Sequence, residues 1–247
     1  MELTIDTNED TLTRIENYTK QIHKTHYNNC SKEVQLILDN FILMEKYSYL
    51  FLHKASNSTL ENLIIPQKEI NDKWFCTHDK PTINKWLYTT SADIFSWSLE
   101  FLSKSDVIKY GCIARDHYKT ALKDDPNMAF ALFGLAQWNI YVPVILGGGK
   151  NKAIKLFKQA IKVSRNRSEK FYSYIYLSQA YFDKNKKQQS SLTLQKALEL
   201  APNSSHIHFI QSLNQDNCSY FEYMTNRTNI ENKVNNDSQM AVKTNDI

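Results

Sequence analysis

The chain has 247 residues, of which 42% are hydrophobic and 12% aromatic, so it is long enough to bury a sizeable core. It contains only five Gly and five Pro, and this scarcity argues against a β-sandwich or barrel, which needs many more turn residues. The net charge of +4, from 30 basic and 26 acidic residues, is too balanced to predict a nucleic-acid-binding protein. The composition predicts long helices and an all-α fold.

Export and membrane signals are absent from the sequence as it is given. Residues 1–10 are acidic and polar, with no basic segment, apolar run or lipobox. The most apolar stretch, Val34 to Leu52, is interrupted by charged residues and makes a poor membrane span. The sequence therefore predicts a cytoplasmic protein without membrane insertion. A periplasmic location would require that the N-terminus is wrongly assigned.

Two helices are expected at the start of the chain. Apolar residues recur at helical spacing over residues 9–28, and over 32–55 they nearly encircle the helix, so the second helix should be buried on more than one side. Ser31 is a candidate N-cap for it. We expect residues 1–81 to form a helical region that caps whatever follows.

Residues 56–81 differ in character from these helices. The run from Ser56 to Ser58 predicts a break, and Pro66 and Pro81 punctuate the segment, which leaves room for a short helix near 67–75. Helical periodicity returns at Thr82 with many aromatic residues. From about residue 214 the sequence becomes polar and aperiodic, and we expect a disordered tail over 214–247.

A pattern of small, large and small residues recurs three times between these ends. The spacing suits the second helix of a helix pair, in which small residues let helices approach closely and a following Pro ends the helix. The three sets start 39 and 37 residues apart, and extra residues near 141–150 and 164–169 account for the excess over a 34-residue period. The signature residues are Ala114, Tyr118, Ala121 and Pro126; Ala153, Phe157 and Ala160; and Ser190, Leu194, Ala197 and Pro202; with Leu177 and Tyr181 in a first helix.

On these residues the chain resembles the tetratricopeptide repeat family over about residues 95–204. The resemblance implies an α-α superhelix of about three tetratricopeptide-type helix pairs, with extra N-terminal helices. The array would occupy 82–213, with units at about 95–128, 129–167 and 171–204. Related α-solenoids share this period and remain an alternative.

A narrower resemblance covers about residues 112–185. The run from Tyr141 through Pro143 and Gly147–Gly149 to Ala153 looks like the T component of TRAP transporters, which carries such an insertion between paired helices. This resemblance implies an accessory subunit that works with a periplasmic solute receptor. T components are typically exported, and no export signal is present here. A truncated start, a cytoplasmic relative and a convergent loop all remain open.

In tetratricopeptide arrays the first helices line a concave groove, and the resemblance implies the same here. The expected lining residues are Leu99, Phe130, Phe133, Gln137, Tyr141, Tyr172, Ile175, Gln179 and Phe182. This set is aromatic with a few amides and contains no Lys or Arg, which suits an apolar helix, an extended peptide or a greasy ligand. The alternative is that some of these residues pack beneath the N-terminal helices or the tail.

No constellation in the sequence predicts catalysis, a cofactor or a metal site. The Gly147–Lys150 run lacks the spacing of a phosphate-binding loop, and the pairs His23/His26 and His206/His208 have no acidic or Cys partner at ligand spacing. An enzyme would need a cluster that converges only in three dimensions. We expect a non-enzymatic scaffold whose partner is a protein or peptide and not nucleic acid; a homo-oligomer is also compatible.

Overall fold

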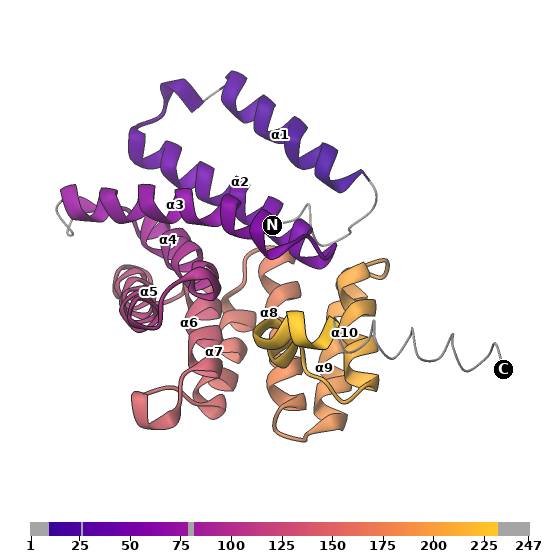
Figure 1. Cartoon of the computed structure of the whole chain (residues 1–247). Helices are drawn as coiled ribbons and strands as arrows, with labels where there is room; N and C mark the ends of the chain where they lie inside the picture. Colours follow the sequence, from indigo (N-terminus) through magenta and orange to yellow (C-terminus); the bar gives the residue numbers. More distant parts are fainter. Residues whose placement is uncertain (1–9, 26, 79–81, 232–247) are drawn as a thin grey trace.

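The structure is a computed structural model, and it describes residues 10–25, 27–78 and 82–231 (Figure 1). Over these residues the chain forms helices and connecting turns, with no strand. Consecutive helices pack in adjacent pairs as a superhelix, so the predicted all-α fold is confirmed. The structure describes only part of the expected tail, since residues 232–247 lie outside the described ranges.

The helices follow one another in a regular order along the chain. The α-helices are α1 (Thr11–Thr25), α2 (Lys32–Leu52), α3 (Asn57–Thr77), α4 (Lys85–Ser98), α5 (Lys104–Asp124), α6 (Ala129–Tyr141), α7 (Lys150–Val163), α8 (Arg167–Phe182), α9 (Lys187–Leu200) and α10 (Ser205–Gln215). Short 3-10 turns are η1 (Tyr27–Asn29), η3 (Leu99–Phe101) and η4 (Val144–Leu146). Residues 220–231 form a further helix, which we call the C-terminal helix.

Polar side chains fix where several of these helices begin. The Ser31 hydroxyl accepts a hydrogen bond from the backbone N–H of Val34, which confirms the predicted N-cap of α2. Ser56 caps α3 in the same way, and Asn166 caps α8. Each cap satisfies a backbone N–H that has no partner within its helix.

The prediction for residues 56–81 is wrong. Instead of a short helix near 67–75, α3 runs unbroken from Asn57 to Thr77 and includes Pro66. Ser56 does interrupt the helical structure, because it is the N-cap residue at which α3 starts. Pro66 removes one backbone hydrogen bond, and the burial of Leu60 and Ile64 on α3 outweighs that loss.

The repeat array consists of the pairs α4–α5, α6–α7 and α8–α9. The small signature residues on the second helices are buried, and the aromatic ones lie between successive pairs. The ring of Phe157 on α7, for example, lies 6.0 Å from Phe133 on α6 and 6.2 Å from Tyr176 on α8. Pro126 and Pro202 each follow the end of a helix, as the pattern predicts.

The first pair departs from the predicted unit of 95–128. Its first helix, α4, begins at Lys85 and ends at Ser98, so Leu99 falls in the 3-10 turn η3 and is only partly buried. Only residues 99–103 separate α4 from α5, so the first helix of this pair lies earlier in the sequence than the predicted unit. In α4 the buried Ala92 and Phe95 occupy the core positions that the predicted unit assigned to residues further along the sequence.

The N-terminal helices attach to the array through a buried polar network. The Asn40 amide on α2 donates to the Thr90 hydroxyl on α4 at 3.0 Å and accepts from Gln67 and Asn71 on α3 at 2.8 and 3.0 Å. Asn40 is fully buried, so these bonds replace its contacts with water. The network joins α2, α3 and α4 in a single relative position.

Gly134 on α6 offers a test of the close approach between successive pairs. A Cβ atom there would lie 2.3 Å from the Tyr118 ring, which is buried and holds a hydrogen bond to Asp93. We expect Gly134→Ala to lower the free energy of unfolding by about 1–3 kcal/mol. Gly111→Ala is the control, since nothing lies within 4 Å of its Cβ position, and it should stabilise α5 by up to about 1 kcal/mol. Urea denaturation measures both, and equal effects would contradict the tight packing at Gly134.

Candidate functional site

The C-terminal helix packs against the array and crosses in front of α8 in Figure 1. The backbone N–H of Tyr220 donates to the side-chain oxygen of Gln179 at 2.9 Å. The rings of Tyr220 and Phe221 lie 5.8 and 5.6 Å from Tyr176 on α8. The expectation of a disordered tail from residue 214 is therefore wrong up to residue 231, because this segment buries aromatic side chains against the array.

The same helix also reaches the N-terminal region. The Arg227 guanidinium lies 4.9 Å from the Phe51 ring centroid and donates to the backbone oxygen of Ala55 at 2.5 Å. Arg227 is buried and pairs with Glu231 at 3.2 Å. The C-terminal helix thus bridges α2 and α8 and closes one part of the groove.

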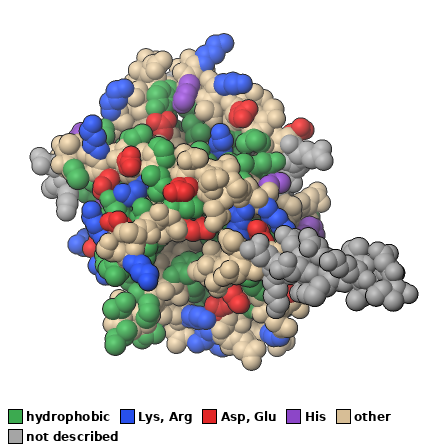
Figure 2. All heavy atoms as spheres, in the orientation of Figure 1, with side chains coloured by type: hydrophobic (Ala, Val, Ile, Leu, Met, Phe, Trp, Pro, Cys, Tyr) green, Lys and Arg blue, Asp and Glu red, His purple; other side chains and the backbone are tan. Residues whose placement is uncertain are grey.

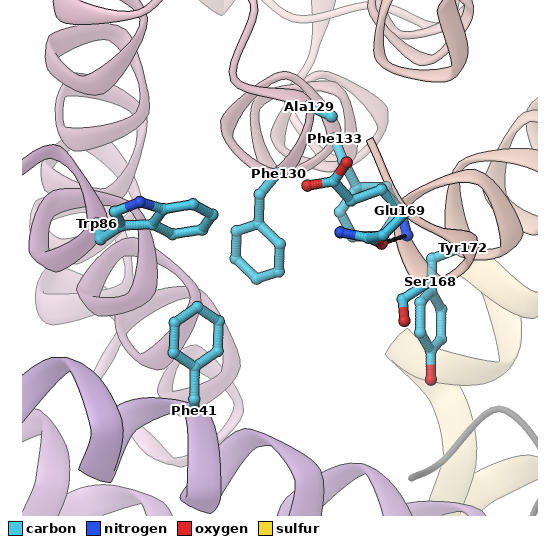
Figure 3. Close-up of a pocket in the computed structure, with 9 residues that line it drawn as sticks. Phe41, Trp86, Ala129, Phe130, Phe133, Ser168, Glu169 and Tyr172 are labelled. Carbon is cyan, nitrogen blue, oxygen red and sulfur yellow. Dashed lines mark hydrogen bonds between the residues drawn. The ribbon is translucent and has the colours of Figure 1, made fainter. Parts of the chain in front are cut away.

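An aromatic cavity of about 320 Å³ remains open beside this cover. It lies where α2, α4, α6 and α8 meet, and Figure 3 shows aromatic side chains from these four helices facing it. The rings of Phe41, Trp86 and Phe130 lie 5.7–6.1 Å from one another. Such offset and tilted rings form a stable apolar wall. The cavity lining is Phe41, Trp86, Ala129, Phe130, Phe133, Asn166, Ser168, Glu169 and Tyr172.

One end of the cavity is polar. It is formed by the first turn of α8, where the backbone N–H of Glu169 donates to the Asn166 side chain at 2.9 Å (Figure 3). The Glu169 carboxylate in turn accepts from the backbone N–H of Arg165 at 2.7 Å. Among the described residues that line the cavity, none is Lys or Arg. The cavity therefore combines an aromatic wall with a carboxylate, a hydroxyl and an amide at one side.

The structure brings three of the nine predicted groove residues to this cavity: Phe130, Phe133 and Tyr172. Ile175 and Gln179 are fully buried, so their predicted place on an open surface is wrong. The C-terminal helix contacts Gln179 through the backbone N–H of Tyr220. Tyr141 is 41% exposed, with its ring 5.8 Å from Phe221.

The remaining groove residues, Leu99, Gln137 and Phe182, are partly buried and lie outside the cavity lining. Two aromatic residues of the site, Phe41 and Trp86, are not among the predicted groove residues. The signal that could have found Phe41 was the all-round apolar character of α2, which implies a second packed face. Trp86 belongs to the aromatic segment after Thr82, but only the helix pairing puts it beside Phe130.

Asp93 and Tyr118 are two titratable groups that the fold buries. Burial raises the pKa of Asp93 from 3.8 to about 7, and the Tyr118 hydroxyl donates to it at 2.7 Å. Both side chains are buried in the core between α4 and α5 and do not belong to the cavity lining.

The histidines and acidic residues do not form a metal centre in the described part of the chain. His206 is buried while His208 is exposed, so the two cannot share a site at the surface. Burial lowers the pKa of His206 to about 4, which keeps this histidine neutral.

Among the described residues, no helix is both long enough and apolar enough to cross a bilayer.

The raised pKa of Asp93 predicts how the free energy of unfolding depends on pH. Since folding raises its pKa, its contribution to the unfolding free energy is complete below about pH 4 and is lost as pH rises through about 7. The lowered pKa of His206 makes its contribution to stability change with pH in the opposite direction. The test therefore compares the wild type with Asp93→Asn, which isolates the contribution of Asp93. The wild type's advantage over the variant should shrink by up to about 4 kcal/mol between these pH values. Urea denaturation at several pH values measures the difference in unfolding free energy between the two proteins. A difference that stays constant with pH would contradict the raised pKa of Asp93.

Neither the models of known protein families nor the curated proteins compared with this sequence give a match. The tetratricopeptide resemblance therefore depends on the signature residues and on the helix pairing described above.

Proposed function

We propose that this chain is a non-enzymatic scaffold of the tetratricopeptide type that binds a protein partner through its aromatic cavity. The observation that carries the proposal is the meeting of Phe41, Trp86 and Phe130 around an open space of about 320 Å³ on the array's inner side. Partner-binding surfaces concentrate their affinity in such aromatic pockets. A cytoplasmic location stays a prediction of the sequence.

The chemistry of the lining suggests what the partner presents. A cavity at the lower end of the usual ligand-pocket volume suits one large apolar side chain and not an extended cofactor. Glu169 at the polar end favours a hydrogen-bond donor or a basic residue next to that side chain. We therefore propose a peptide segment with an aromatic or aliphatic anchor beside Lys or Arg.

Peptide selection from a random displayed library, followed by calorimetry, tests this function. Peptides selected on the wild type should bind Phe41→Ala at least about tenfold more weakly, because the variant removes one wall of the cavity. Glu169→Gln should weaken only those peptides with a basic residue beside the anchor. The matched control is Phe75→Ala, a partly buried Phe on α3 outside the lining.

Thermal melts show whether each variant remains folded. Equal loss of binding in Phe41→Ala and Phe75→Ala would mean that general destabilisation, and not the cavity, controls binding. Full binding by both variants would place the peptide site elsewhere on the molecule.

The second candidate function is an accessory subunit of a TRAP-type solute transporter, which binds a receptor or an apolar ligand. The observation that favours it is the inserted turn between α6 and α7, with Pro143 followed by Gly147–Gly149. The cavity is also large enough for a small apolar ligand without a peptide.

A neutral apolar probe such as N-phenyl-1-naphthylamine separates the two candidates. If the cavity holds small ligands, the probe should quench Trp86 fluorescence and raise the melting temperature. Ala129→Leu, which adds volume to the lining, should abolish both effects. Absence of both effects in the wild type would exclude an apolar ligand in this cavity and leave binding of a peptide or of a receptor protein.

A further inference from the structure

The turn between α6 and α7 exposes three consecutive aliphatic side chains. Val144, Ile145 and Leu146 in η4 are 76%, 92% and 66% exposed. Figure 2 shows hydrophobic side chains gathered at the lower left, over the place where Figure 1 draws this turn. Isolated surface aliphatic residues are ordinary, but a contiguous group at a protruding tip marks a site of contact.

Backbone hydrogen bonds fix the conformation of the turn that exposes this tip. The N–H of Gly149 donates to the Asn139 carbonyl at 2.7 Å, and the N–H of Gly148 donates to that of Pro143 at 3.2 Å. A Cβ at Gly148 would lie 1.9 Å from the Val142 carbonyl oxygen, so only glycine fits there. The turn is therefore held in a shape that keeps its aliphatic side chains outward.

Positive charge surrounds the tip. Residues 126–168 contain seven Lys and Arg and no Asp or Glu, so the rest of the chain, at +4 less these seven, carries −3. Four lysines on α7 are exposed: Lys152, Lys155, Lys158 and Lys162. Asp116 pairs with Arg115 at 2.8 Å, and Asp183 pairs with Lys150 at 2.9 Å.

A depression of about 390 Å³ connects the tip to this basic surface. Apolar side chains, among them Leu146, Trp138 and Leu156, belong to its lining. Four cations belong to the same lining: Arg115, Lys119, Lys152 and Lys155. A lining that combines apolar and cationic side chains matches the acyl-chain and phosphate parts of a lipid interface.

We propose that this surface, comprising the tip 144–146 and the basic face of α7, docks the protein peripherally on a bilayer that contains anionic lipids. A nucleic acid would use the cations but would leave the aliphatic tip exposed to water. A second copy of the chain would bring like charges together. The sequence predicted no membrane insertion; the surface contact proposed here is shallow and needs no membrane-spanning helix, and it is separate from the aromatic cavity.

Vesicle flotation with the full chain tests the proposal. The probes are vesicles of phosphatidylcholine alone and vesicles of equal parts phosphatidylcholine and phosphatidylglycerol. The protein should float with the mixed vesicles, and raising NaCl from about 0.1 M to about 0.5 M should weaken that partition because salt screens the lysines. Ile145→Ser should reduce partition by about tenfold, the effect expected from one aliphatic side chain leaving the interface.

Two matched controls separate the tip and the basic face from general effects. Leu192→Ser removes a 61% exposed aliphatic residue from α9 and should leave partition unchanged. Lys155→Glu with Lys162→Glu should reduce partition more than about tenfold, at about fivefold for each charge near the surface. Lys20→Glu with Lys24→Glu on α1 makes the same change of charge elsewhere and should have little effect.

Three outcomes would overturn the proposal. Equal partition into both vesicle types would remove the role of charge. Equal loss in Ile145→Ser and Leu192→Ser would remove the role of the tip. Binding of a duplex DNA or RNA oligonucleotide that Lys155→Glu with Lys162→Glu weakens and Ile145→Ser does not, without vesicle binding, would assign the basic face to nucleic acid.

Discussion

The buried amide of Asn40 is the constraint on which the site depends. Its oxygen accepts from Gln67 and Asn71 on α3, and its nitrogen donates to Thr90 on α4. A buried amide that lost these partners would incur a large desolvation cost, so α2 has a single favourable register against its neighbours. Phe41 is the next residue along α2, and this register puts its ring against Trp86 and Phe130.

The helix pairs could be predicted because their packing leaves a local pattern. Small residues at Ala114, Ala153 and Ala160 are needed wherever two helices approach closely, and the aromatic residue between them fills the gap. That requirement repeats with the period of the fold, so one sequence is enough to detect it. The failure at α3 has the opposite cause, because tertiary burial there overrides the local preference of Pro66.

The candidate site could be predicted only in part. Phe130, Phe133 and Tyr172 lie on first helices of the array, where the repeat phase places inward residues. Phe41 comes from outside the array, and no local pattern connects it to them. The C-terminal helix was missed because its few aromatic residues, such as Tyr220 and Tyr223, are surrounded by polar sequence and acquire their partners only through long-range contact.

The contact between Arg227 and Ala55 has a consequence for how the molecule unfolds. In an open solenoid each unit touches only its neighbours, so the ends can fray while the middle stays folded. Here residues 172 positions apart in sequence are joined by a hydrogen bond, and the same helix packs on α8. The C-terminal helix therefore joins the N-terminal region to the last pair of the array, and unfolding should resemble the all-or-none transition of a globular domain more than the stepwise unravelling of a repeat protein.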